Sequence, residues 1–230
     1  MKSQQSGFTL VEIAIVLVII GLLLGGILKG QELINSAKVK NLANDFRTIP
    51  TYVYAFQDKF RALPGDDTAA QTHMSNCTVA ISCANGNGNG VINGDWNSNT
   101  ASDESNQFWL HIRLANLAPG STTVGTISDT SDFVQKNALG GRMGLSSYVS
   151  SGATPSAQIT GMNGTYQICS KGILGKFVRQ LDIMLDDGKI DAGSFRAQEV
   201  PGDGSTPTKG AATADNTLDD AKSYLVCMTF

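Results

Sequence analysis

Residues 8–28 read FTLVEIAIVLVIIGLLLGGIL, and this stretch decides the fold. Only Thr9, Glu12 and the glycines interrupt its apolar side chains. As an α-helix rising about 1.5 Å per residue it spans roughly 31 Å, close to the hydrocarbon thickness of a bilayer. A carboxylate inside a membrane segment is costly, so Glu12 is a functional-site hypothesis in its own right.

The seven residues before this stretch, MKSQQSG, differ from an ordinary secretory signal. Such a signal places its apolar segment before a small-residue cleavage site, so that the apolar part is removed. Here the small residue, Gly7, precedes the apolar segment. Cleavage after Gly7 would leave the hydrophobic helix on the mature chain.

Residues 7–12, GFTLVE, resemble the processing site of the type IV prepilin and pseudopilin family. The resemblance implies cleavage between Gly7 and Phe8 by a prepilin peptidase and N-methylation of Phe8. It also implies that the new Phe8 ammonium pairs with Glu12 of a neighbouring subunit during assembly. The alternative is a plain single-pass anchor in which Glu12 has no role.

A second apolar pattern follows the membrane stretch. Its positions recur at alternating spacings of three and four, which predicts one face of a continuing helix. They are Val39, Leu42, Phe46, Ile49, Val53, Phe56, Phe60 and Leu63. We expect a single helix from about Phe8 to Arg61, ended by Leu63-Pro64-Gly65. The face would pack on a sheet; a coiled-coil homodimer is the alternative.

Composition narrows the function classes. Residues 65–230 carry ten Lys/Arg against sixteen Asp/Glu, which argues against a nucleic-acid surface. The two histidines, His73 and His111, belong to no metalloprotease motif, and we find neither a nucleophile elbow nor a phosphate loop. His111 is predicted to be a surface or core histidine. We expect no enzyme.

Residues 68–105 are predicted to form a long loop region rather than a packed unit. Within it, residues 85–95 (NGNGNGVINGD) echo an EF-hand loop, with oxygen ligands at alternate positions. Asn replaces Asp at the first positions, and Trp96 stands where the bidentate Glu belongs. Calcium would need carboxylates from Asp66, Asp67, Asp95, Asp103 or Glu104. A glycine-rich turn region is the favoured interpretation.

The remaining pattern predicts short elements. An amphipathic helix is expected over 105–117, loops and short strands over 121–165, and a second helix over 174–185. Strands are expected at 165–169, 194–197 and 224–228.

An acidic cluster surrounds the turn after the second helix: Asp182, Asp186, Asp187 and Asp191. A solvated turn with capping carboxylates is the favoured interpretation. Calcium is the alternative, because the resemblance extends to major pseudopilins, which bind calcium in a C-terminal loop.

Four cysteines in an exported domain predict two disulfides. Proximity favours Cys77 with Cys83, which leaves Cys169 with Cys227, but sequence alone leaves the pairing open.

The predicted fold is α+β and pilin-like, with a long N-terminal α-helix packed on a small antiparallel β-sheet and long loops. Its segments are a cleaved leader (1–7), a transmembrane and filament-core helix (8–28), an amphipathic continuation (29–64) and a globular head (65–230).

The resemblance implies a subunit that polymerises into a type IV pilus-like filament for adhesion, motility or DNA uptake. A type II secretion pseudopilin and a non-polymerising membrane-anchored binding domain are the alternatives. The implied partners are copies of the chain, the peptidase, the inner-membrane assembly platform with its ATPase, and lipid before assembly. The chain would first sit in the inner membrane with a periplasmic head, and later in an extracellular pilus or periplasmic pseudopilus.

Overall fold

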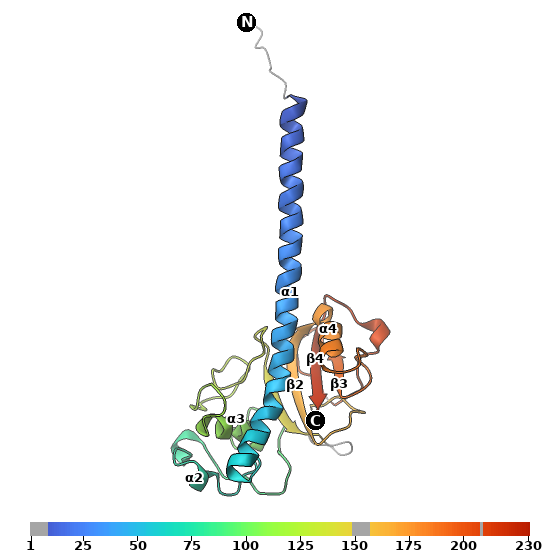
Figure 1. The fold of residues 1–230 in the computed structure, drawn as a ribbon. Coiled ribbons are helices and arrows are strands. Elements are labelled where there is room, and N and C mark those ends of the chain that lie inside the picture. The colour runs from blue at the N-terminus through green and yellow to red at the C-terminus, as the bar shows by residue number, and fades with distance from the viewer. Residues whose placement is uncertain (1–8, 149–156, 208) are drawn as a thin grey trace. The chain divides into compact units, whose positions relative to one another are not determined.

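The computed structural model describes residues 9–148, 157–207 and 209–230, and it divides the chain into two compact units. The first ends at Lys38 and the second is Val39–Phe230. The elements, in chain order, are α1 (Leu10–Phe60), α2 (Ala70–His73), the 3-10 turn η1 (Val79–Ile81), α3 (Glu104–Leu114), β1 (Met143–Ser147), β2 (Tyr166–Leu174), α4 (Gly175–Leu185), β3 (Phe195–Glu199), the 3-10 turn η2 (Asp215–Thr217) and β4 (Ser223–Thr229) (Figure 1).

The predicted long helix is confirmed as α1, which continues through Pro50. Residues 10–38 belong to the first unit and residues 39–60 to the second. In the second unit the predicted apolar face is buried, at Val39, Leu42, Phe46, Ile49, Val53 and Phe56. The Phe46 ring lies 6.0 Å from that of Phe195 on β3. Because these side chains fill the core of their own unit, the coiled-coil alternative is wrong for this face.

The four strands form one antiparallel sheet in the order β1-β2-β4-β3. Helix α3 packs against β1, and α4 packs against β2, β3 and β4 (Figure 1). The expected strands at 165–169, 194–197 and 224–228 are all present, and β1 lies in the stretch expected to hold loops and short strands. The predicted α+β fold, a long helix with a small antiparallel sheet, is therefore confirmed.

Both faces of the sheet are buried. Along β4, Tyr224 and Val226 face the main core, whereas Leu225 and Cys227 face a second, smaller core. This alternation follows from the two-residue period of a strand. Cys169 on β2 is the register partner of Cys227, and a disulfide joins them with their Cα atoms 4.1 Å apart. A second disulfide joins Cys77 to Cys83.

The loop region at 68–105 and the helix expected over 105–117 are both present, but they are more buried than the sequence predicted. Helix α3 is not amphipathic: every residue from Glu104 to Arg113 is buried. The 68–105 region has little regular structure, yet Ile92 and Trp96 are almost completely buried in it. Polar side chains of α3 hydrogen-bond the surrounding loops, and these bonds allow a polar helix to lie inside.

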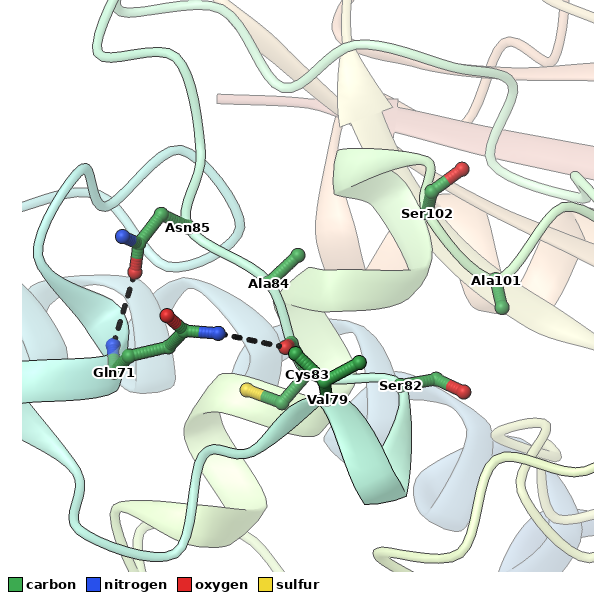
Figure 2. Close-up of a pocket in the computed structure, with 8 residues that line it drawn as sticks. All are labelled: Gln71, Val79, Ser82, Cys83, Ala84, Asn85, Ala101 and Ser102. Atoms are coloured by element: carbon green, nitrogen blue, oxygen red, sulfur yellow. Dashed lines mark hydrogen bonds between the residues drawn. The ribbon is translucent and has the colours of Figure 1, made fainter.

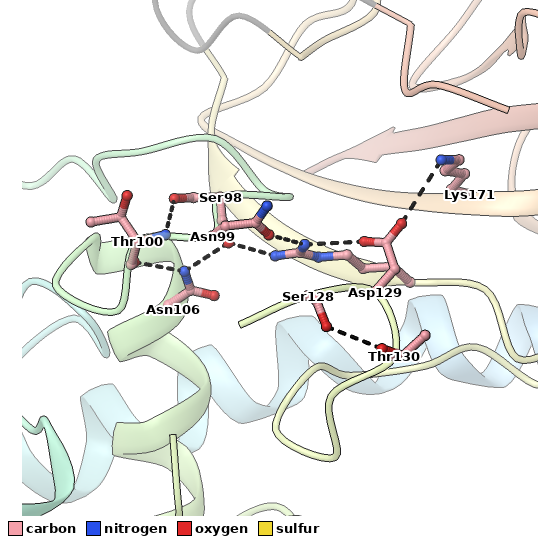
Figure 3. Close-up of polar contacts among 9 residues, drawn as sticks. Ser98, Asn99, Thr100, Asn106, Ser128, Asp129, Thr130 and Lys171 are labelled. Carbon is pink, nitrogen blue, oxygen red and sulfur yellow. Dashed lines mark hydrogen bonds and ion pairs between the residues drawn. The ribbon is translucent and has the colours of Figure 1, made fainter. Parts of the chain in front are cut away.

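One such polar network ties the loops to the sheet (Figure 3). The buried Arg142, which directly precedes β1, donates to Asn99 Oδ1 (2.8 Å) and Asp129 Oδ1 (3.2 Å). Asp129 also lies 3.9 Å from Lys171 on β2, and Asn106 on α3 donates to the carbonyls of Ser98 and Thr100. The loops around residues 98–100 and 129 are thereby held as parts of the second unit.

Candidate functional site

The first unit offers an apolar surface with no partner inside the described chain. Every residue from Thr9 to Lys29 is exposed, including large side chains such as Leu17 and Leu22. Among the described residues, α1 is the one helix long and apolar enough to cross a membrane by length and composition. A helix that is apolar all round is stable only when lipid or other helices cover it.

Glu12 has a local role that the sequence analysis missed. Its Oε2 accepts hydrogen bonds from Thr9 N (2.8 Å) and Thr9 Oγ1 (2.7 Å), and Glu12 N donates to Thr9 Oγ1 (3.3 Å). This is the reciprocal capping box that begins many helices, and its signal was the Thr-x-x-Glu spacing at 9–12. The exposed carboxylate is therefore held at the helix start, beside the predicted cleavage point. Gly7 and Phe8 themselves lie outside the described residues.

The acidic turn after α4 gathers three of the four predicted carboxylates. Ligand oxygens of Asp182, Asp186 and Asp187 lie within 4.8 Å of one another. Asp191 is not in this group: its Oδ2 instead accepts a hydrogen bond from the backbone N–H of Asp215. Asp215, which the sequence analysis did not single out, also pairs with Arg179 at 2.8 Å.

The three clustered carboxylates differ in how well they are satisfied. Asp186 Oδ2 accepts from the N–H groups of Ser194 and Phe195, and Asp182 Oδ1 accepts from Gly188 N. Asp182 Oδ2 is buried and has no hydrogen-bond partner in the described structure. Burial, and then the neighbouring negative charges, raise the pKa of Asp182 to about 6. The cluster also stands at the C-terminal end of α4, where the helix dipole disfavours negative charge.

These residues fit a hard divalent cation. Calcium binds carboxylate oxygens at about 2.3–2.6 Å, so ligand atoms spaced as these are can share one ion. A cation would also satisfy the orphaned oxygen of Asp182. The fit involves three carboxylates, with Asp191 outside the set.

The other candidate calcium loop is organised differently. The N–H groups of Gly88, Asn89 and Gly90 all point to the carboxylate of Asp66. Glu104 accepts from the N–H groups of Asn87 and Asn93 in the same way. Both carboxylates are buried and engaged by backbone donors. The loop is therefore a turn region closed around the chain's own carboxylates, as the favoured interpretation predicted.

His111 is a core residue, as one branch of the prediction held. Its Nδ1 accepts from Gly65 N, and its Nε2 lies 3.0 Å from the carbonyl of Ala84. Burial lowers the pKa of His111 to about 4, against the opposing effects of the Ala84 hydrogen bond and the Asp67 charge. The neutral imidazole joins the end of the long helix region to the 77–85 loop. It lies near Cys77 and Cys83, whose sulfurs are already joined in a disulfide.

Comparison with known proteins bears on the N-terminal region. The prokaryotic N-terminal methylation motif matches residues 2–28, the stretch that contains Gly7, Phe8 and Glu12. No curated protein and no solved structure matches the chain. The match covers the segment in which the sequence analysis located the resemblance to prepilins. The chain thus carries at its N-terminus the signature of the type IV pilin and pseudopilin family.

Proposed function

We propose that the chain is a filament subunit, cleaved between Gly7 and Phe8, methylated on Phe8 and polymerised through α1 into a type IV pilus-like filament. It acts in adhesion, motility or DNA uptake and has no catalytic activity of its own. Prepilin peptidase processes it, and an inner-membrane platform with its ATPase assembles it. Before assembly the helix lies in the inner membrane with the head in the periplasm; afterwards the subunit is extracellular.

One observation carries this proposal: the exposed apolar surface of residues 10–28 carries a single carboxylate, Glu12, near its start. In the lone chain the Thr9 cap satisfies that carboxylate. When helices pack together away from water, a buried charge needs a partner charge, and losing one member of such a pair costs about 3–5 kcal/mol. Cleavage after Gly7 would create the Phe8 ammonium that can serve as this partner.

The experiment compares Glu12→Gln with Glu12→Val in the native cell. Gln can still form the capping box but carries no charge, whereas Val neither forms the capping box nor carries a charge. We expect both variants to enter the membrane and to be cleaved, and neither to yield filaments in the sheared surface fraction. Mass spectrometry of wild-type filaments should find methylated Phe8 at the N-terminus.

Glu32→Gln is the matched control, since Glu32 is an exposed carboxylate on the same helix, paired with Lys29 at 2.6 Å. It should assemble normally. Normal filaments from Glu12→Gln would refute the charge-pairing mechanism. Full function of the unassembled Glu12→Gln protein would favour the alternative of a membrane-anchored binding domain.

A type II secretion pseudopilin is the second candidate, and the acidic turn favours it. We propose that Asp182, Asp186 and Asp187 hold one calcium ion there, which would neutralise the cluster and fix the connection from α4 to β3.

Calcium should raise the thermal unfolding temperature of the full-length protein in detergent, and Asp182→Asn should abolish that rise, with Asp203→Asn as an exposed control. An equal rise in Asp182→Asn would exclude this site. Secretion defects without surface filaments in a deletion strain would identify the pseudopilus.

A further inference from the structure

A cavity of about 440 Å³ opens beside the small disulfide loop of the second unit (Figure 2). This volume lies within the roughly 300–1,000 Å³ typical of small-molecule sites. Its lining comes from α2, from the 77–85 loop and from the segment before α3: Gln71, Val79, Ser82, Cys83, Ala84, Asn85, Ala101 and Ser102. None of these eight side chains carries a charge.

The wall of this cavity is fixed from behind by buried side chains of α3. Gln107 accepts from Ala84 N and donates to the carbonyls of Ser82 and Ala101. His111 holds the carbonyl of Ala84. The Cys77–Cys83 disulfide closes the loop to which these side chains bind. A site held this firmly loses little conformational entropy when a ligand binds.

The backbone conformation of the 77–85 loop also indicates that its surroundings hold it in place. Ser82 has a φ of 60°, in the left-handed region that residues other than glycine seldom occupy. Such strain persists only where surrounding contacts enforce it, and it gathers at functional positions. On the same loop Val79 is 82% exposed and lines the cavity, so an apolar side chain is held in solvent next to the opening.

Several side-chain groups are left for a ligand. In the described structure no hydrogen bond occupies Gln71 Oε1, Asn85 Nδ2, Ser82 Oγ or Ser102 Oγ, although Gln71 and Asn85 use their other atoms (Figure 2). Several backbone groups of the wall are already hydrogen-bonded: Gln71 Nε2 donates to Cys83 O, Gln107 binds Ser82 O and Ala84 N, and His111 binds Ala84 O. The cavity thus presents neutral donors and acceptors above small aliphatic side chains.

We propose that this cavity binds an uncharged sugar. Amide and hydroxyl side chains can both donate and accept, as the hydroxyl groups of a sugar require, while Val79, Ala84 and Ala101 offer a surface for its C–H groups. A peptide strand binds largely through free backbone groups, and the carbonyls of Ser82, Cys83 and Ala84 in this wall are already engaged. An acidic or basic ligand would find no opposite charge in the lining. The site needs neither cleavage nor polymerisation, so it can be tested apart from the filament proposal.

The experiment uses the full-length protein in detergent micelles and saturation-transfer NMR, followed by calorimetry. The probes are glucose, galactose, N-acetylglucosamine and their β-linked disaccharides, set against glucuronic acid, N-acetylneuraminic acid and a blocked Ala-Ser-Gly-Ala peptide. We expect at least one neutral sugar to bind with a Kd on the order of 1 mM or tighter. The acidic sugars and the peptide should bind at least roughly tenfold more weakly.

Two surface variants test the location. Ser102→Tyr fills the cavity and should weaken binding of the neutral sugar by more than roughly tenfold. Val79→Ala should weaken the same binding roughly threefold. Both residues are exposed, so folding should be preserved. Thr126→Tyr and Ile183→Ala are matched controls, since both residues are exposed and neither lines the cavity. The proposal is overturned if no neutral sugar binds at about 10 mM, if only the peptide or acidic sugars bind, or if Ser102→Tyr leaves binding unchanged.

Discussion

The two halves of α1 show opposite relations between sequence and burial. From Leu10 to Leu28 nearly every position is apolar and every position is exposed. From Val39 to Phe56 apolar residues recur every three or four positions, and the residues at those positions are buried. Periodicity therefore identifies a helix that packs within its own chain, whereas uniform apolarity identifies one whose partners are lipid or other chains.

The glycines of the first half extend this contrast. A Cβ placed on Gly21 or Gly25 would meet nothing within 4 Å. In the second unit, a Cβ on Gly144 would collide with the carbonyl of Trp96. Packing within the second unit thus explains the glycine at position 144. No contact in the described chain explains Gly21 or Gly25. Small residues in apolar helices allow close helix–helix approach, which agrees with the proposed assembly.

Truncating one large side chain in each half gives the largest expected difference. Phe46→Ala should lower the free energy of unfolding of the second unit by about 3–5 kcal/mol, because Phe46 is fully buried against Phe195. Leu17→Ala should change it by less than about 0.5 kcal/mol, because Leu17 is 63% exposed. Denaturant titration of the full chain in detergent, followed by near-UV circular dichroism, measures both. Equal losses would show that the first half of α1 also stabilises the head.

A smaller effect should come from pH, and only in the second unit. Burial lowers the pKa of His111 from 6.5 to about 4, so the unfolded chain binds a proton at a higher pH than the folded chain does. The contribution of His111 to the free energy of unfolding is therefore constant above pH 6.5. It falls as the pH drops toward 4 and then levels off. The total loss should be up to about 3 kcal/mol.

Comparing the unfolding free energy of wild type and His111→Gln between pH 7 and pH 4 isolates this contribution, because the carboxylates titrate in both proteins. Gln can still donate to Ala84 and accept from Gly65. His73→Gln serves as the control for the other histidine, whose Nδ1 lies 2.7 Å from Asp67 Oδ2. An identical pH slope in wild type and His111→Gln would mean that His111 does not titrate as its burial implies.

Sequence reasoning succeeded where one local rule acts alone. The 3-4 spacing from Val39 to Phe56 gave the buried face of α1, and the alternation over residues 165–169 located β2. It failed for α3, whose residues from Glu104 to Arg113 look amphipathic but are all buried. That burial depends on partners such as the carbonyl of Ser82, which Gln107 binds from 25 residues away in the sequence. No local pattern reports such hydrogen bonds.

The same division holds for the candidate sites. The sequence by itself determined the processing motif, the membrane-length helix and the position of Glu12, because these depend only on composition and on spacing along one helix. Only the tertiary structure decided that Asp66 is held by backbone donors, that Asp191 lies outside the acidic cluster, and that a neutral cavity lies beside the Cys77–Cys83 loop. The physical reason is that burial, pKa shifts and cavities arise from groups brought together across long stretches of chain.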